Sequence, residues 1–378
     1  MGFLRRFKKK SIMCLFIGLM SGTSVDAIDA VLVEFVGPKV QVHAVHSHPW
    51  PPSLREMLLT LSQQTREQST LHDIATLDIK VGELLAEASL ALLEKSQIAR
   101  DKICAIGNPG QTLYHHPQGT PPYTWQLGDP NVIAQITGIP TIADFRRRDV
   151  AAGGQGAPLA PGFHNAQFRT PQENRVILNI GGIANITVLP ADETQEVVGF
   201  DTGPGNALLD AYALIQKHLP MDEQGAFAAT GQIKQTLLDA MLADAYFAKS
   251  APKSTGRDYF NLDWLNCHTL GLRLHPEDIQ ATLCQLTITS IAQAILPYAP
   301  QRLLVCGGGV HNPLLMDGLA KQLPDCLIES TAAVGVDPDL VEAISFAWLA
   351  QQRLNKQPGN LPSVTGASQA VLLGSIYL

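Results

Sequence analysis

The sequence has 378 residues, of which 46% are hydrophobic and 16% are charged, and its net charge is −7. This balance excludes a disordered chain, and the length exceeds the roughly 250–300 residues that one core supports, so we expect two lobes. The negative charge argues against nucleic acid and anionic membranes as partners, because the field of the whole protein attracts neither.

The N-terminal region imitates a signal peptide, because the basic residues of 1–10 precede an apolar run at 12–20. That run is short, has no small-residue cleavage site and continues into a Gly/Ser/Thr turn, so we interpret it as a core strand. No other segment reaches the roughly 20 apolar residues that span a bilayer, which predicts a cytoplasmic protein. The six cysteines lack the short paired spacing of a zinc or redox site, and we expect reduced thiols.

The first half of the chain opens with a predicted hairpin. Apolar runs at 14–20 and 27–36 flank the turn at 21–26. The elements expected next are helices at 53–63 and from 71 to about 95, and a short buried strand at 103–106. Residues 115–165 are rich in Pro, Gly, His and Arg, and we expect an irregular, functional stretch there with one strand at 139–142.

The second half opens in the same way. A hairpin at 175–180 and 183–189 is joined by Gly181–Gly182, and a strand at 197–200 leads into Asp201–Gly205. Because strand, glycine turn and strand head both halves, we expect a duplicated α/β fold with one ligand cleft between two lobes. The other expected elements are helices at 206–217, 232–248, 278–294 with Asp278 as its cap, 313–323 and 338–353, and a strand at 302–306.

Three glycine-rich turns lie at the expected strand ends, where backbone N–H groups can approach a phosphate without a Cβ in the way. The first is at 21–26, the second combines Gly181–Gly182 and Asn185 with Gly203, and the third is Gly307–Gly309. Each turn alone is typical of ordinary structure, but three in one chain favour nucleotide binding. The chain has no Walker A sequence and no early Gly-x-Gly-x-x-Gly, which disfavours P-loop and Rossmann folds.

A series of sequence blocks carries a more specific signal. In chain order they are Ile17–Asp26, Gly110–Thr112, Asp144–Pro158, Asn179–Asn185, Phe200–Asn206, Lys253–Arg257, Gly307–Asn312 and Gly335–Glu342. They are similar to the signature blocks of the anhydro-N-acetylmuramic acid kinase family and extend over nearly the whole chain. The resemblance implies a duplicated ribonuclease H-like (actin-like ATPase) fold and a homodimer. We expect an N-terminal lobe of residues 11–145, completed by about 355–378, and a C-terminal lobe of 146–354.

The family converts the 1,6-anhydro form of N-acetylmuramic acid, a product of cell-wall turnover, into N-acetylmuramic acid 6-phosphate with ATP, Mg²⁺ and a water molecule. The resemblance implies that Asp201 is the base that takes a proton from this water as it attacks the anomeric carbon, after which O6 lies in line for the γ-phosphate. Together with the glycine turns it implies ATP contacts at Gly22, Thr23, Ser24, Val25, Asp26, Ala27, Ile28, Asp29, Gly181, Gly182, Asn185, Gly203, Gly307, Gly308 and Gly309. The expected sugar contacts are Gln111, Thr112, Arg146 and Glu342, and Asp26 is the expected Mg²⁺ ligand.

Two positions depart from the family pattern. Pro109 stands where histidine is usual, and proline neither donates a hydrogen bond nor titrates. Ala27 replaces a glycine of the first hairpin, which requires a backbone angle that suits a β-carbon. Pro109 makes an actin-like kinase for another amino sugar an alternative.

Other interpretations of the same residues stay open. Asp201 has the composition of a helix cap, Glu342 that of a surface helix position, and Arg146 that of a solvated charge run. A zinc peptidase is suggested by the histidines at 43, 46 and 48, but these have mixed parity on an expected strand, which favours surface histidines. A non-kinase actin-like ATPase such as a chaperone would need a substrate domain, for which no residues remain.

Overall fold

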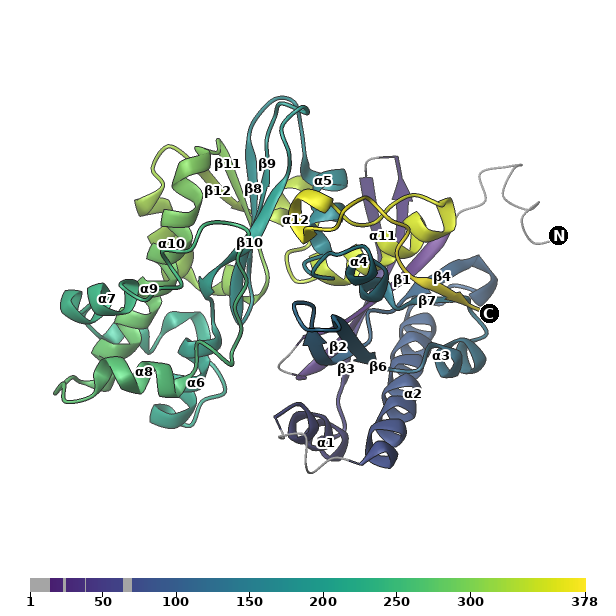
Figure 1. The fold of residues 1–378 in the computed structure, drawn as a ribbon, viewed down its shortest axis with the longest axis horizontal. Coiled ribbons are helices and arrows are strands. Elements are labelled where there is room, and N and C mark those ends of the chain that lie inside the picture. Colours follow the sequence, from purple (N-terminus) through teal and green to yellow (C-terminus); the bar gives the residue numbers. More distant parts are fainter. Residues whose placement is uncertain (1–13, 23–24, 38, 64–69) are drawn as a thin grey trace. The chain divides into compact units, whose positions relative to one another are not determined.

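The computed structural model describes residues 14–22, 25–37, 39–63 and 70–378, and the chain forms two compact units (Figure 1). Unit 1 comprises the chain up to residue 151 together with 343–359 and 371–378, and unit 2 comprises 152–342 and 360–370. Each unit contains its own sheet with helices packed around it.

The sheet of unit 1 consists of β1 (Leu15–Ser21), β2 (Ala27–Val36), β3 (Lys39–Pro49), β4 (Ile103–Gly107), β7 (Thr141–Ala143) and β13 (Ser375–Tyr377). Its order is β13-β7-β4-β1-β2-β3. β1, β2 and β3 form an antiparallel meander, which confirms the first predicted hairpin, and Ser21 lies opposite Ile28 beside its turn. β4 is parallel to β1 and β7 is parallel to β4, whereas β13 pairs antiparallel with β7 at the edge.

The sheet of unit 2 consists of β8 (Arg175–Ile180), β9 (Ile183–Leu189), β10 (Val198–Pro204), β11 (Arg302–Cys306) and β12 (Leu327–Ser330), in the order β10-β9-β8-β11-β12. β8, β9 and β10 form an antiparallel meander, and β11 and β12 are parallel to β8. The series β3-β2-β1-β4-β7 of unit 1 has the same order and directions. This repetition confirms the predicted duplicated ribonuclease H-like, actin-like fold.

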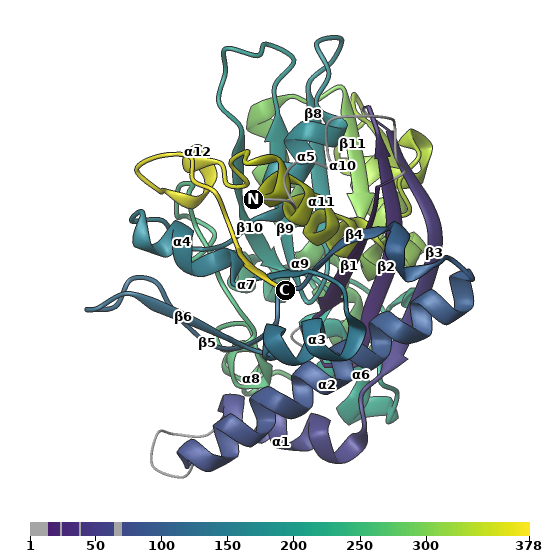
Figure 2. The ribbon, with the colours of Figure 1, turned by 90° about the vertical axis from the view of Figure 1, so that its right-hand side faces the viewer.

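Helices cover both sheets. Those of unit 1 are α1 (Pro52–Gln63), α2 (Leu71–Ser96), α3 (Pro130–Thr137), α4 (Phe145–Ala151) and most of α11 (Val341–Asn355). Those of unit 2 are α5 (Ala160–Phe168), α6 (Ala207–Lys217), α7 (Gln235–Leu242), α8 (Leu262–Thr269), α9 (Pro276–Ile295), α10 (Pro313–Gln322) and α12 (Pro362–Thr365). α2 begins with a capping box between Thr70 and Asp73, and it packs against β2, β3 and α3 (Figure 2).

Two glycines let α11 pack directly on the sheet of unit 1. A Cβ at Gly18 of β1 would overlap the carbonyl oxygen of Ala343, and a Cβ at Gly107 of β4 would overlap that of Phe346. This close approach holds residues 343–354 in unit 1, whereas the division made from the sequence assigned them to the C-terminal lobe. The glycines themselves gave no sign of it, because their partners are more than 200 positions away.

The stretch from 115 to 165 is more ordered than its composition suggests. It contains most of a separate hairpin, β5 (Gln111–His116) with β6 (Tyr123–Leu127), followed by α3, β7, α4 and α5. The expectation of an irregular stretch was therefore wrong. A signal for α3 was present in the sequence, since Asp129 caps this helix and Pro130 is its first residue.

α9 is the central helix of unit 2. Together with the turn after it, Pro276–Tyr298 is the stretch of the described residues that is long and apolar enough to cross a membrane, but 72% of its apolar window is buried inside unit 2. Its cap residue is His275, so the predicted cap at Asp278 was wrong. Asp278 instead accepts a hydrogen bond from the N–H of Gln232 and forms an ion pair with Lys234 at 2.8 Å.

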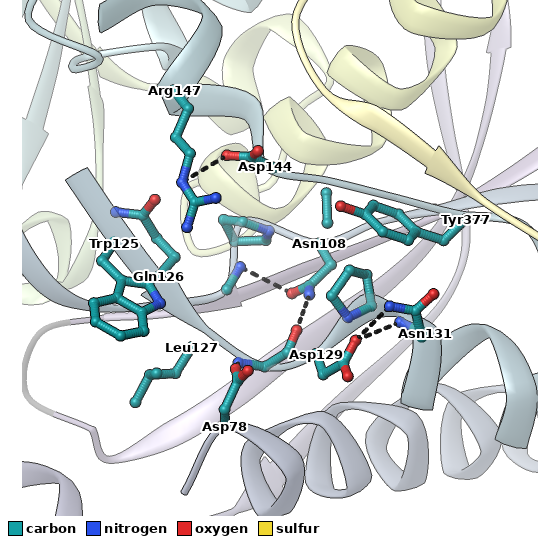
Figure 3. Close-up of a pocket in the computed structure, with 15 residues that line it drawn as sticks. Asp78, Asn108, Trp125, Gln126, Leu127, Asp129, Asn131, Asp144, Arg147 and Tyr377 are labelled. Atoms are coloured by element: carbon teal, nitrogen blue, oxygen red, sulfur yellow. Dashed lines mark hydrogen bonds and ion pairs between the residues drawn. The ribbon is translucent and has the colours of Figure 1, made fainter. Parts of the chain in front are cut away.

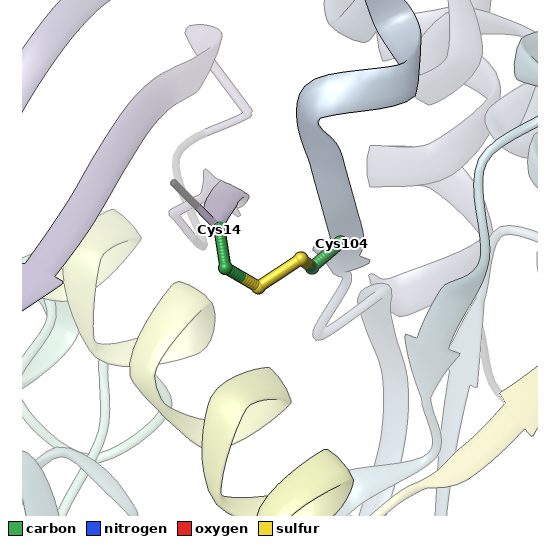
Figure 4. Close-up of a disulfide and its surroundings, with 2 residues drawn as sticks. All are labelled: Cys14 and Cys104. Carbon is green, nitrogen blue, oxygen red and sulfur yellow. A yellow bond between two sulfur atoms is a disulfide. The ribbon is translucent and has the colours of Figure 1, made fainter. Parts of the chain in front are cut away.

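Cys14 and Cys104 form a disulfide between the segment before β1 and β4 (Figure 4). Their Cα atoms lie 5.6 Å apart because β1 and β4 are parallel neighbours, with Leu15 opposite Ile103. The expectation of six reduced cysteines was wrong for this pair, which is separated by 90 positions and is brought together only by strand pairing. The remaining cysteines, Cys267, Cys284, Cys306 and Cys326, are free thiols.

Candidate active site

Three polar side-chain positions form a row across the sheet of unit 2. Asp201 of β10 lies opposite Asn185 of β9, and Asn185 lies opposite Asn179 of β8. The sequence suggested that the strand ends before Asp201. In the structure β10 extends to Pro204, so Asp201 lies within it. The cap position of α6 is Asn206, which removes the interpretation of Asp201 as a helix cap. A β-bulge follows Asp201, a device that frequently directs side chains near active sites.

The Gly181–Gly182 turn at the end of this row is held by the start of α6. The carbonyl oxygen of Gly181 accepts a hydrogen bond from the N–H of Asn206, and that of Gly182 accepts from Gly205 and Ala207. A Cβ at Gly205 would overlap the Gly181 carbonyl oxygen, so only glycine allows this contact. Because its carbonyl groups are occupied by α6, the turn has a defined shape.

The third glycine turn lies beside the end of β8. Gly307 has φ +76°, and a Cβ there would overlap the Asn179 side chain, while a Cβ at Gly309 would overlap Ile180. Gly308 lies between them with no described atom within 4 Å of its Cβ position. The fold therefore brings together the predicted nucleotide residues of unit 2 at one end of its sheet.

Asp201 is held by groups from a distant loop. Its Oδ2 accepts a hydrogen bond from the N–H of Thr255 at 3.0 Å, and its own N–H donates to the carbonyl oxygen of Lys253. Its carbonyl oxygen accepts from the Tyr246 hydroxyl at 2.7 Å. Burial raises the pKa of Asp201 to about 6, and the Thr255 hydrogen bond opposes this rise. The carboxyl group is thus fixed in place, and its pKa of about 6 lies well above that of an ordinary aspartate.

The loop at 253–257 was recognised in the sequence only as a family block, without assigned roles. In the structure the guanidinium of Arg257 lies over the glycine turn, with its Nη2 2.8 Å from the Cβ position of Gly182. Lys253 donates to the carbonyl oxygens of Tyr246 and Phe247, and burial lowers its pKa. The loop therefore places the Arg257 guanidinium over the turn and the Lys253 backbone beside Asp201. No local pattern reveals this, since the loop follows Asp201 by more than 50 residues.

The first hairpin turn lies in unit 1. The N–H of Val25 donates to the Gly22 carbonyl oxygen, and Val25 has φ +54°, which is costly for a β-branched residue and typical of functional turns. Asp26 is exposed and forms an ion pair with Arg55 at 3.3 Å. Ala27, Ile28 and Asp29 begin β2, so Ala27 has a strand conformation that accommodates its β-carbon. The predicted contacts Thr23 and Ser24 lie outside the described residues.

The four predicted sugar contacts occupy different places. Gln111 is buried, and its Nε2 donates to the Gly22 carbonyl oxygen at 3.4 Å, so it lies beside the first turn. Thr112 accepts from Gln126 within the β5–β6 hairpin, and Arg146 belongs to α4. Glu342 is in the first turn of α11, in unit 2, where its charge helps to raise the pKa of the buried Cys306 thiol.

Unit 1 also contains a cavity of about 280 Å³ beside Pro109 (Figure 3). Pro109 and Gly110 are among its lining residues, and the ring of Trp125 lies at one side of it. Asp144 and Arg147 close its upper side, with the carboxylate 3.6 Å from the guanidinium. None of the four predicted sugar contacts is among its lining residues. Pro109 therefore lines this cavity with a side chain that neither donates a hydrogen bond nor titrates.

The histidines of β3 do not form a metal site. His46 Nε2 lies 3.2 Å from His48 Nδ1, whereas His43 lies beside Glu34 at 3.6 Å. In the part of the chain that the structure describes, no three His, Cys, Asp or Glu side chains are grouped as a metal site requires.

Comparisons with known proteins cover nearly the whole chain. The family model described as "Anhydro-N-acetylmuramic acid kinase" matches residues 14–378. Proteins of that name are 48% identical in Coxiella burnetii over 364 residues (96% of this chain and 97% of the relative) and 50% identical in Xylella fastidiosa over 368 residues (96% of each). A solved structure, the activator of the 2-hydroxyisocaproyl-CoA dehydratase from Clostridium difficile with bound ADPNP, is 15% identical, with a TM-score of 0.46 and coverage of 90% of this chain and 96% of that one. The chain belongs to the anhydro-N-acetylmuramic acid kinase family.

Proposed function

We propose that this chain uses ATP to convert 1,6-anhydro-N-acetylmuramic acid and water into N-acetylmuramic acid 6-phosphate and ADP. The observation that carries the proposal is the family match from residue 14 to the last residue, in a chain whose Asp201 stands fixed beside a glycine turn. The reaction belongs to the recycling of peptidoglycan. We further propose that the enzyme is cytoplasmic and acts as a homodimer.

Asp201 is the base of the proposed reaction. It takes a proton from the water that attacks the anomeric carbon, and the bond from that carbon to the bridging oxygen breaks. The released O6 then attacks the γ-phosphate. The supporting observations are the rise of the Asp201 pKa to about 6, which suits a base at neutral pH, and its fixation by Thr255 and Lys253.

The ATP phosphates are proposed to bind at the glycine turns. Gly182 leaves room for the guanidinium of Arg257 above the turn, and Asn185 lies in the same row as Asp201. Arginine holds phosphate through two parallel hydrogen bonds, so Arg257 joins the predicted nucleotide contacts. In unit 1, Gly22 and Val25 belong to the corresponding turn, and Gln111 lies beside it.

Mg²⁺ is expected to bind together with the ATP phosphates. This ion binds through one or two carboxylates and keeps several waters and phosphate oxygens as ligands. Asp26 fits such a role, because its side chain is 71% exposed beside the first turn and its partner Arg55 is itself partly exposed. When bound, Mg²⁺ supplies positive charge that stabilises the transferring phosphoryl group.

The turnover number should follow the ionisation of Asp201. Burial raises its pKa to about 6, and only the carboxylate accepts a proton. We therefore expect kcat to be level above pH 6 and to fall about tenfold for each pH unit below it. Initial rates at saturating ATP and sugar across this range measure the effect. A kcat that stays constant through pH 6 would contradict the role of Asp201 as base.

The proposed role of the third glycine turn in ATP binding is tested by the substitution Gly308→Ala. The added methyl group meets no described atom within 4 Å and no positive φ is present there, so the fold should be unchanged. If the backbone at Gly308 contacts the nucleotide, the methyl group should weaken ATP binding about tenfold, the loss of one good hydrogen bond. Calorimetric titration with an ATP analogue measures this affinity. Unchanged affinity would remove Gly308 from the nucleotide contacts.

The atom that water attacks is identified with water enriched in the heavy oxygen isotope. Water attack at the anomeric carbon predicts one heavy oxygen in the sugar product, on C1, and none in its phosphate group. Mass spectrometry of the intact product and of the phosphate released from it separates the two positions. A sugar 6-phosphate without heavy oxygen on C1 would mean that water does not attack the anomeric carbon and would overturn the proposed chemistry.

A further inference from the structure

Unit 1 contains a second cavity, of about 440 Å³, which the proposed reaction does not use. Its walls come from α4, α11 and the segment before and within β13. Three of its lining residues are arginines, namely Arg147, Arg148 and Arg353. The only lining residue with a carboxylate is Asp144. This volume is in the range of small-molecule sites.

The three guanidinium groups differ in how they are held. Arg353 is anchored, because its Nε donates to the Gly374 carbonyl oxygen at 2.7 Å. Arg147 lies 3.6 Å from Asp144, which is longer than a hydrogen bond, and donates weakly to Thr124 at 3.4 Å. Arg148 is exposed and has no hydrogen-bond or ion-pair partner among the described residues. The cavity therefore has donors that protein groups leave unused.

The charge of the lining selects the ligand. Three arginines and one aspartate leave two positive charges without a counter-charge, in a protein whose total charge is −7. A phosphate monoester carries close to two negative charges at neutral pH, and guanidinium groups bind its oxygens in pairs. We propose that this cavity is a binding site for a phosphate monoester, separate from the nucleotide and sugar contacts.

The site is distinct by position as well as by charge. None of the predicted ATP or sugar contacts lines it. The neighbouring cavity of Figure 3 shares Asp144 and Arg147 but adds Asp78 and Asp129, so it repels anions. Arg148 and Arg353 line only the larger cavity. An anion is thus directed to the side of Arg147 that faces these two residues.

The location gives the ligand a structural effect. α4 ends at residue 151, where the chain leaves unit 1, and the segment at 371–375 begins where it returns. Arg353 lies on α11, the helix in which the chain passes from unit 2 into unit 1. A bound phosphate group joins these three segments within unit 1 and stabilises the folded chain in proportion to its occupancy.

Calorimetric titration of the full chain with inorganic phosphate, glucose 6-phosphate and D-lactate tests the site. We expect saturable binding of a phosphate compound, weakened about tenfold in Arg148→Gln and in Arg353→Gln, because each loses a hydrogen bond to a charged group. Arg148 is exposed and its side chain makes no hydrogen bond or ion pair within the described residues, so we expect its variant to fold normally. Arg273→Gln removes an equally exposed arginine of unit 2 and should bind like the wild type.

The three compounds distinguish the source of the phosphate group. Tighter binding of glucose 6-phosphate than of inorganic phosphate assigns the site to organic phosphates, and the reverse order assigns it to free phosphate. Equal affinities of the Arg148→Gln, Arg353→Gln and Arg273→Gln variants for phosphate would overturn the proposal. So would tighter binding of lactate than of either phosphate compound.

Discussion

Asp201→Asn is expected to lower kcat about a thousandfold while ATP affinity stays within about a factor of two. Loss of a general base costs roughly two to four powers of ten, and the amide of asparagine cannot take the proton from water. The hydrogen bond from the N–H of Thr255 is retained, because the amide oxygen replaces the carboxylate oxygen. Single-turnover rates and calorimetric titration with an ATP analogue measure the two quantities separately.

We expect the Asp201→Asn protein to be at least as stable as the wild type at neutral pH. Burial raises the Asp201 pKa above its ordinary value, so the folded state disfavours the ionised carboxylate, and the stability cost appears as pH rises from about 4 to above 6. The neutral asparagine avoids this cost, and the variant should melt at the same or a higher temperature at neutral pH. Normal turnover in a well-folded Asp201→Asn protein would remove Asp201 from the mechanism.

Gly18→Ala is expected to lower the free energy of unfolding of unit 1 by about 3 kcal/mol. The added Cβ would overlap the carbonyl oxygen of Ala343, which is backbone and cannot rotate away. α11 must therefore shift away from β1, and its buried apolar side chains lose contacts. Chemical denaturation followed by circular dichroism measures the loss.

Gly308→Ala is the matched control for this prediction, because the same methyl group meets open space there. Its stability without nucleotide should equal that of the wild type. Equal stability of the Gly18→Ala protein would mean that α11 does not pack on β1 as closely as the structure has it.

The duplicated fold could be predicted from the sequence because its signals are local. The turns at 21–26 and Gly181–Gly182 interrupt apolar runs of strand length, and both hairpins were found at nearly their true limits. Elements whose stability comes from distant partners were missed. β13 has three residues and exists because it pairs with β7, more than 200 positions earlier. The disulfide between Cys14 and Cys104 depends in the same way on the pairing of β1 with β4.

The candidate site shows the same limit. The family blocks identified Asp201 and the glycine turns, and the fold gathers the residues of unit 2 at one end of its sheet. The sequence contains no periodicity that relates Thr255 to Asp201 or Arg257 to Gly182, because those contacts join a loop to a strand and a turn far from it. The loop at 253–257 could be recognised as a motif, but its roles required the structure.

The most direct test is the release of ADP from ATP and Mg²⁺ by the purified full chain, measured with and without 1,6-anhydro-N-acetylmuramic acid. We predict that ADP forms at a substantial rate only when the anhydro sugar is present, and that N-acetylmuramic acid, which has no internal bridge to open, does not replace it. ADP release at the same rate without sugar would contradict a sugar kinase, and release with an ordinary amino sugar alone would contradict the proposed substrate.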